Sequence, residues 1–317
     1  MSDHHHHHDH THGHGHDHAH GARHVHAPAS FGKAFIIGIV LNTAFVVIEA
    51  VYGFTSNSVA LLADAGHNLS DVLGLVVAWA ASVMSQRAPS SRYTYGLRGT
   101  SILAALFNAI FLMVSVGAIG WEAILRLFEP AAVEGKTVMV VAGIGILING
   151  FTALLFASGR KGDINIQGAF LHMAADAAIS AGVVIAALVI LITGWQWLDP
   201  AVSLAISAII IWATWGLLRD SVAMSLAAVP DRIDSAEVHG LLQRQTGVSG
   251  VHDLHIWSMS TTEIALTAHL VMDGGCPGDE FLLAVGDRLR HDHGIGHVTL
   301  QVERDGGLCP QRPAHVV

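Results

Sequence analysis

The chain has 317 residues, of which 52% are hydrophobic and 13% are charged, and its mean hydropathy is +0.50. This composition is too apolar for a soluble domain and indicates a membrane protein. The net charge of -9 arises mainly in residues 220–317, where thirteen acidic residues face six Arg. This surplus argues against a nucleic-acid partner and favours nearby cations.

The N-terminal tract is unusually rich in histidine. Residues 1–26 carry thirteen of the 23 His, first as a run at 4–8 and then alternating with Gly, Asp, Thr and Ala. A polar, low-complexity tract of this kind cannot build a core and is predicted to be disordered. The run alone would fit a purification tag, but the alternation continues to His26 and favours a native tail that gathers divalent metals. We therefore expect a disordered, His-rich cytoplasmic tail at residues 1–30.

Six apolar segments follow, each near the roughly 20 residues that a bilayer-spanning helix needs; they lie at residues 35–54, 59–84, 102–125, 137–158, 166–193 and 200–218. Connections on one side of the predicted membrane are basic, with Arg87, Arg92, Arg98, Arg160 and Lys161. Those on the opposite side hold only Arg126 and Lys136. By the positive-inside rule, both termini are expected in the cytoplasm, flanking a six-helix transmembrane domain at residues 31–219.

Beyond residue 220 the hydropathy falls and the periodicity changes. Helices are predicted at 235–246 and 278–293, and strands at 251–260, 263–272 and 297–303. The order α-β-β-α-β predicts a small α+β domain at residues 220–305, with its helices on one face of a three-stranded sheet. We expect this domain on the cytoplasmic side, followed by a C-terminal tail at residues 306–317.

Ionisable residues inside apolar segments cost roughly 2.5 to 3.5 kcal/mol each on insertion scales, so they normally face a cavity and have a function. This chain has six: Glu49, Asp64, His67, Asp71, His172 and Asp176. The last four form two His-x3-Asp pairs on separate spans, and residues four apart share a helix face. Each pair therefore presents an imidazole and a carboxylate together. For Glu49 or Asp64 alone, a helix-packing hydrogen bond is an equally good interpretation.

The residue types of the two pairs point to a transition-metal ion. Two imidazoles and two carboxylates suit a tetrahedral ion, which favours zinc first. Cobalt and nickel stay open because imidazole also binds them, whereas calcium and magnesium prefer more oxygen ligands. Two Asp would offset one divalent cation, while an empty site must hold protons or leave carboxylates uncompensated. Because metal ligands must be deprotonated, the pattern favours exchange of metal for protons.

Two other classes of function, a metalloenzyme and a metal buffer or sensor, compete with transport. An intramembrane metalloenzyme needs an open metal position for water and a general base. The sequence contains no His-Glu-x-x-His motif and no evident Ser or Cys nucleophile beside the pairs, so we expect no enzymatic activity and no cofactor. A membrane-bound metal buffer or sensor would need the His-rich tail and the C-terminal domain, but no site between the second and fifth spans.

Several motifs together resemble the cation diffusion facilitator (CDF) family. They are the six spans, the two His-x3-Asp pairs, Tyr95-Gly96-Leu97-Arg98 before the third span, and the Val-His-Asp-Leu-His-Ile-Trp sequence at 251–257. The resemblance covers residues 31–305. It implies a homodimeric metal/proton antiporter that exports zinc or a related divalent ion from the cytoplasm by alternating access, and a ferredoxin-like cytoplasmic domain. Zinc is then the transported substrate, and the compact chain suggests a bacterial plasma membrane.

The resemblance also assigns roles to individual residues. It places His67, Asp71, His172 and Asp176 in the transport site, and the family associates His at the first position with a preference for zinc over cadmium. A Glu frequent at the start of the third span is replaced here by Ser101 or a neighbour. The family often binds regulatory metal in the cytoplasmic domain at the dimer contact. The matching residues are His252, His269 and Glu303, with His239 and His255 as competing ligands.

Overall fold

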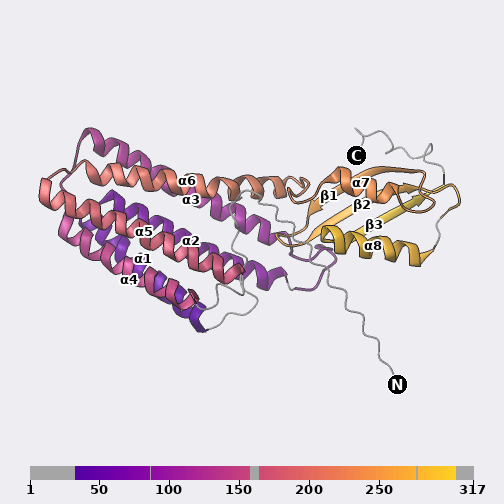
Figure 1. Cartoon of the computed structure of the whole chain (residues 1–317), viewed down its shortest axis with the longest axis horizontal. Coiled ribbons are helices and arrows are strands. Elements are labelled where there is room, and N and C mark those ends of the chain that lie inside the picture. The colour runs from indigo at the N-terminus through magenta and orange to yellow at the C-terminus, as the bar shows by residue number, and fades with distance from the viewer. Residues whose placement is uncertain (1–32, 86, 158–163, 276–277, 305–317) are drawn as a thin grey trace, which may run out of the picture.

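The computed structural model describes residues 33–85, 87–157, 164–275 and 278–304. The expected tails at residues 1–30 and 306–317 lie outside these residues. Figure 1 shows an elongated molecule with a bundle of long helices at one end and a small mixed domain at the other. The two predicted types of structure are therefore spatially separate.

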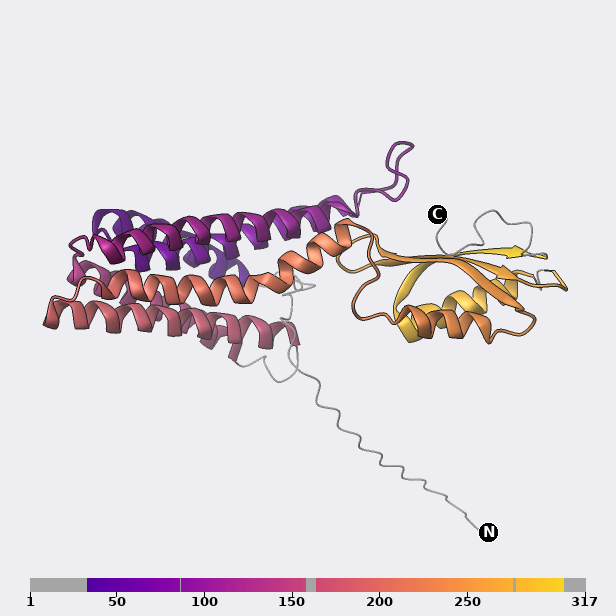
Figure 2. The same cartoon turned by 90° about the horizontal axis from the view of Figure 1, so that it is seen from above.

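The bundle contains six helices, which are α1 (Lys33–Thr55), α2 (Val59–Ser85), α3 (Thr100–Phe128), α4 (Gly135–Ala157), α5 (Ile164–Thr193) and α6 (Leu198–Ser225). They follow the predicted segments closely. The largest difference is the end of α6, which continues past the predicted residue 218 as polar turns leading toward the C-terminal domain (Figure 2). Hydropathy marks the apolar part of a helix and cannot register a polar extension of it.

Four of these helices are long and apolar enough to cross a membrane, counted over the described residues: α3, α4 through Leu154, α5 from Phe170, and α6. α1 adds a shorter apolar stretch at Ile39–Thr55. α2 carries the buried polar residues Asn68 and Ser70 beside its ionisable residues. That all six helices cross the membrane stays a prediction.

The bundle packs tightly inside and is apolar outside. Its core joins side chains from the six helices, among them Phe45, Leu61 and Val116. α4 packs along α5, and α3 packs along both α2 and α6. Large apolar side chains such as Phe107 and Trp212 stay exposed on the outside, as expected for a surface that faces hydrocarbon.

The C-terminal domain has the predicted element order. It consists of α7 (Ser235–Gln243), β1 (Gly250–Ser258), β2 (Ile264–Val271), α8 (Asp279–His293) and β3 (Ile295–Glu303). The sheet order is β1-β2-β3, with β1 antiparallel to β2 and β2 parallel to β3. Figure 2 shows both helices on one face of the sheet, where they bury Val238, Leu242 and Leu289 against Leu266 and Leu270. The ferredoxin-like assignment stays a prediction.

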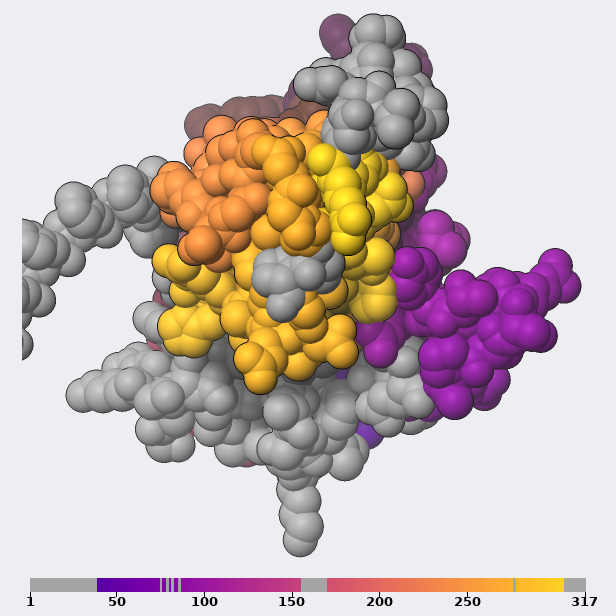
Figure 3. Space-filling view, turned by 90° about the vertical axis from the view of Figure 1, so that its right-hand side faces the viewer, coloured from indigo at the N-terminus to yellow at the C-terminus, as the bar shows by residue number. Residues whose placement is uncertain are grey.

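The connection between α2 and α3 touches the C-terminal domain, as Figure 3 shows for the purple segment beside the orange and yellow one. Arg98 Nη1 lies 2.7 Å from Oε2 of Glu263, which belongs to the loop between β1 and β2. The backbone N–H of Thr261 donates to Ser101 Oγ at 3.1 Å. Ser101 therefore contributes a contact between the domains.

Candidate functional site

The two His-x3-Asp pairs of α2 and α5 meet inside the bundle. His67 Nε2 lies 3.5 Å from Asp71 Oδ2 on its own helix and 3.2 Å from Asp176 Oδ1 on α5. His172 Nε2 lies 3.1 Å from Asp71 Oδ2 and 3.7 Å from Asp176 Oδ2. Each imidazole thus contacts both carboxylates, and we call this closed arrangement of four side chains the ligand ring.

Burial varies steadily across the ligand ring. The Asp176 side chain is 1% exposed and His67 14%, whereas Asp71 is 28% and His172 34% exposed. Asp71 and His172 are the two members closer to the C-terminal end of α2 and the N-terminal end of α5, which is the side of the C-terminal domain (Figure 1). The ring is therefore more open toward the C-terminal domain than toward the opposite end of the bundle.

The ligand ring has the donor set and spacing of a site for a divalent cation. Ligand atoms of His67, Asp71 and Asp176 all lie within 4.8 Å of one another, and His172 joins them through Asp71. Asp176 Oδ2 is buried without a hydrogen-bond partner among the described residues. Unsatisfied polar atoms at one buried point are rare in folded proteins and suit a bound ligand. Four N and O atoms match the coordination that zinc prefers.

Glu49 and Asp64 lie next to the ligand ring but outside it. Both side chains are fully buried. Asn68 Nδ2 donates to Glu49 Oε2 at 3.1 Å, and Ser180 Oγ donates to Asp64 Oδ2 at 2.9 Å. Asn68 adjoins His67 in sequence and Ser180 lies one helical turn beyond Asp176, so helical spacing could have marked these two polar partners in advance.

Asn149 is a buried polar residue that the sequence did not single out. It is fully buried, and neither of its amide atoms has a hydrogen-bond partner among the described residues. A Cβ built on Gly145 would lie 3.1 Å from Ser180 Oγ, and one built on Gly135 would lie 3.2 Å from Ala187 O. Gly145 thus lies beside Ser180 and Gly135 beside Ala187, so α4 and α5 run antiparallel. Asn149 lies four residues after Gly145 on the same face of α4, and Asp176 lies four residues before Ser180 on α5. Asn149 is therefore level with Asp176.

A second cluster lies on the sheet of the C-terminal domain and contains the three predicted residues. His252 Nε2 lies 3.2 Å from Glu303 Oε2, and His269 Nδ1 lies 3.0 Å from Glu303 Oε1. Ligand atoms of the three residues fall within 4.8 Å of one another. The cluster joins all three strands because His252 pairs with His269 across β1 and β2, while Val271 pairs with Glu303 across β2 and β3. Strand alternation from the core residue Leu270 places His269 on the face opposite the helices.

A bulge in β1 adds Asp253 to this cluster. The register shifts between His252 and His255, and Asp253 has a positive φ of 50°. Its carboxylate lies 2.9 Å from His255 Nε2 and 3.4 Å from His269 Nε2. His255 therefore contacts Asp253 rather than completing the three-residue group, and His239 belongs to no such group in the described chain. Strict alternation cannot predict a residue that a bulge redirects, so Asp253 was missed.

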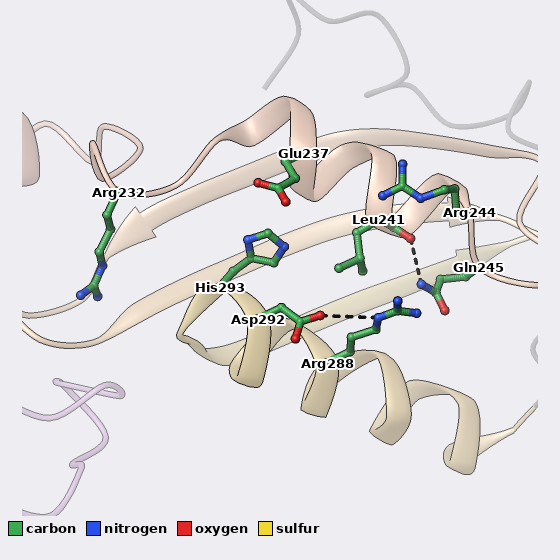
Figure 4. A pocket seen from close by; sticks show the side chains of 8 residues that line it. All are labelled: Arg232, Glu237, Leu241, Arg244, Gln245, Arg288, Asp292 and His293. Carbon is green, nitrogen blue, oxygen red and sulfur yellow. Dashed lines mark hydrogen bonds and ion pairs between the residues drawn. The ribbon is translucent and has the colours of Figure 1, made fainter. Parts of the chain in front are cut away.

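The cavity between α7 and α8 lies apart from both clusters. It measures about 570 Å³, and Figure 4 shows that charged side chains of both signs line it. Arg288 Nε and Asp292 Oδ2 lie 3.6 Å apart there. A hydrogen bond with the neighbouring His291 holds the pKa of Asp292 below its usual value. Because acidic and basic side chains both line the cavity, its charge does not indicate a particular class of ligand.

Comparison with known families covers both domains. The family profile described as "Cation efflux transmembrane domain" matches residues 35–224. The profile described as "Cation efflux protein, cytoplasmic domain" matches residues 230–305. Together they span the helix bundle and the mixed domain.

Individual relatives agree with this assignment. The chain is 36% identical over 285 residues to the cation efflux system protein CzcD of Alcaligenes sp. (strain CT14), covering 89% of this chain and 90% of that protein. It is 33% identical over 287 residues to the cadmium, cobalt and zinc/H(+)-K(+) antiporter of Bacillus subtilis (strain 168), covering 89% and 92%. It is 37% identical over 265 residues to the zinc transporter ZitB of Escherichia coli (strain K12), covering 83% and 84%. The chain therefore belongs to the cation efflux, or cation diffusion facilitator, family of transporters.

Proposed function

We propose that this protein exports a divalent metal cation, with zinc as its main substrate, in exchange for protons by alternating access. The ligand ring of His67, Asp71, His172 and Asp176 is the proposed transport site. The observation that carries this proposal is the contact of each imidazole with both carboxylates across α2 and α5. Relatives named as zinc transporters and as a cadmium, cobalt and zinc antiporter support the substrate class.

In this mechanism the metal enters from the side of the C-terminal domain, where Asp71 and His172 are most exposed. Two carboxylates offset the two charges of the cation, so the loaded ring is neutral within the membrane. The imidazole nitrogens and the carboxylates of the ligand ring must lose their protons to bind metal. Protons that reach the ring from the opposite side then compete with the metal for the same atoms and favour its release.

The orientation follows from charge. Residues 31–219 form the proposed transmembrane domain with six spans, and the basic connections place both termini and the domain at residues 220–305 in the cytoplasm. A bacterial plasma membrane fits the bacterial relatives. The proposed assembly is a homodimer.

The cluster of His252, His269 and Glu303 is a proposed second metal site in the cytoplasmic domain. Its support is the 4.8 Å grouping of its ligand atoms and the additional carboxylate of Asp253. Such a site can sense or buffer cytoplasmic metal. The proposed second site would act beside transport and not carry it, because the proposed transport site lies in the helix bundle.

A transport assay with several metals tests the proposal. The purified protein is reconstituted into vesicles, a pH gradient is imposed, and fluxes of zinc, cobalt, nickel and cadmium are compared. We expect zinc to move fastest and its movement to dissipate the pH gradient, since nitrogen-containing tetrahedral sites suit zinc. Zinc flux that is indifferent to the pH gradient would contradict proton exchange, and faster flux of cobalt, nickel or cadmium would contradict the choice of zinc.

A further inference from the structure

A buried acidic pair lies one helical turn beyond the ligand ring, on the side away from the C-terminal domain. Glu49 of α1 and Asp64 of α2 are both 0% exposed. Asp64 precedes His67 by three residues, about one turn of α2. Since α2 runs toward the C-terminal domain, Asp64 lies on the side from which the proposed mechanism draws protons.

The two carboxyl groups contact each other and share few other partners. Asn68, which donates to Glu49 Oε2 at 3.1 Å, lies four residues after Asp64 on the same face of α2, so the two carboxyl groups lie side by side. One oxygen of each has a neutral donor, the amide of Asn68 for Glu49 and the hydroxyl of Ser180 for Asp64. The other oxygens, Glu49 Oε1 and Asp64 Oδ1, are buried and have no donor in the described parts of the chain.

Contact between two carboxyl groups has a chemical requirement. An ionised carboxylate only accepts hydrogen bonds, so two of them cannot bond to each other. Two adjacent charges in a buried site also repel and lack hydration, which is why close carboxyl pairs share a proton. One bound proton turns one of the two carboxyl groups into a hydrogen-bond donor, and the other carboxylate accepts that hydrogen bond.

The surroundings of the pair contain groups of both signs. His67 lies three residues after Asp64 on α2, and Asp176 lies four residues before Ser180, the donor to Asp64, on α5. Both belong to the ligand ring. α4 contributes the uncharged Asn149 at the level of Asp176. The pair is thus connected to the ring from two helices, through one turn of α2 from Asp64 to His67 and one turn of α5 from Ser180 to Asp176.

We propose that Glu49 and Asp64 form a proton-binding site that supplies protons to the ligand ring during metal release. The pair holds one proton between its two carboxyl groups. That proton passes to a ring ligand as the metal leaves, and a proton from the side away from the C-terminal domain replaces it. This inference rests on the proposed function and adds the carrier of the exchanged proton.

The variants Glu49→Gln and Asp64→Asn separate this role from a structural one. In Glu49→Gln the amide oxygen can still accept from Asn68 and the amide N–H can donate to Asp64, so the variant imitates the proton-loaded pair permanently. Asp64→Asn removes the other carboxyl group. Asp199→Asn is the matched control, because Asp199 is also buried, yet its oxygens accept from Ser58 Oγ and from the backbone N–H of Val59.

The first readout is the infrared spectrum of the zinc-loaded protein, in which the ligands of the ring are deprotonated and a protonated carboxyl group elsewhere is detected directly. We expect a buried protonated-carboxyl band in the wild type and in Asp199→Asn, and its loss in Glu49→Gln and Asp64→Asn. Absence of the band from the wild type, or its persistence in both variants, overturns the proposal. A pair occupied by a monovalent cation instead of a proton would give the first of these results.

The second readout compares two kinds of zinc flux in vesicles. Zinc–zinc exchange needs the ring but no proton delivery, whereas pH-driven flux needs both. In Glu49→Gln we expect exchange at the wild-type rate and pH-driven flux reduced about 100-fold, the low end of the contribution of a positioned proton-transfer group. Equal loss of both fluxes, or an unchanged pH-driven flux, overturns the proposal. Wild-type protein without pH-driven zinc flux would instead refute the proposed function itself.

Discussion

At the scale of single residues, Asp176 is the most buried member of the ligand ring and has few polar neighbours. Asp176 contacts both imidazoles, yet its Oδ2 and the whole amide of Asn149 have no hydrogen-bond partner among the described residues. The register of α4 and α5 brings these two groups to the same level. Asn149 is therefore suited to orient Asp176 when a cation occupies the ring.

Replacement of Asn149 tests this orientation. We expect Asn149→Ala to weaken zinc binding to the ring by about 10- to 100-fold, the usual effect of removing a group that orients a metal ligand. Competition with a chromophoric chelator measures the affinity. Thr152→Val on the same helix is the control, because Thr152 is buried but donates within its own helix to Ile148 O. Equal affinities for Asn149→Ala and the wild type would show that Asn149 does not act on the ring.

At the scale of elements, α2 is held at its start by the beginning of α6. Asp199 accepts from the backbone N–H groups of Val59 and Ala60, and Ser58 Oγ accepts from that of Leu61. These bonds satisfy donors that a helix N-terminus otherwise leaves without partners. They fix the end of the helix that carries His67.

Loss of this cap is expected to destabilise the bundle. We expect Asp199→Ala to reduce the free energy of unfolding by about 1–2 kcal/mol, as for other helix caps, and to lower the unfolding temperature in detergent. Asp231→Ala serves as the control, since Asp231 is 77% exposed and pairs loosely with Arg219; surface changes of this kind stay within about 0.5 kcal/mol. Matching unfolding temperatures for the two variants would refute the capping role.

The elements were also the part of the structure most accessible from the sequence. Long apolar runs predicted all six helices, with bounds within about three residues except for the polar end of α6. The two His-x3-Asp pairs identified the residues that meet in the ligand ring. Both features repeat within a single helix and can therefore be recognised from the sequence. Asn149 and Asp253 were not predicted. Asn149 depends on the register between two helices, and Asp253 on a bulge that interrupts strand alternation. Neither feature can be recognised from the pattern of neighbouring residues in the sequence.

At the scale of the whole molecule, two candidate metal clusters occupy separate domains that touch through Arg98 and Glu263. Glu263 directly precedes β2, which carries His269 of the second cluster. Arg98 precedes α3, which packs along α2 of the ligand ring. The contact offers a physical connection between metal binding in the C-terminal domain and the helices.

The separation of the clusters predicts independent metal binding. Glu303→Gln removes a carboxylate that contacts both His252 and His269. We expect equilibrium dialysis to show one fewer tightly bound zinc per chain in Glu303→Gln, with pH-driven transport retained. Acidification should release zinc from the wild-type cluster, because its imidazoles must be deprotonated to bind metal. An unchanged zinc count in Glu303→Gln would contradict the second site.

The ligand ring is the proposed site of the transported ion. Asp176→Asn tests it most directly, because the substitution keeps the size of a side chain that is 1% exposed and removes its charge. The measurement is pH-driven zinc flux into vesicles that contain folded, membrane-inserted variant at the wild-type amount. We expect this flux to fall to the rate of protein-free vesicles. Zinc flux at the wild-type rate in Asp176→Asn would contradict the assignment of the transport site.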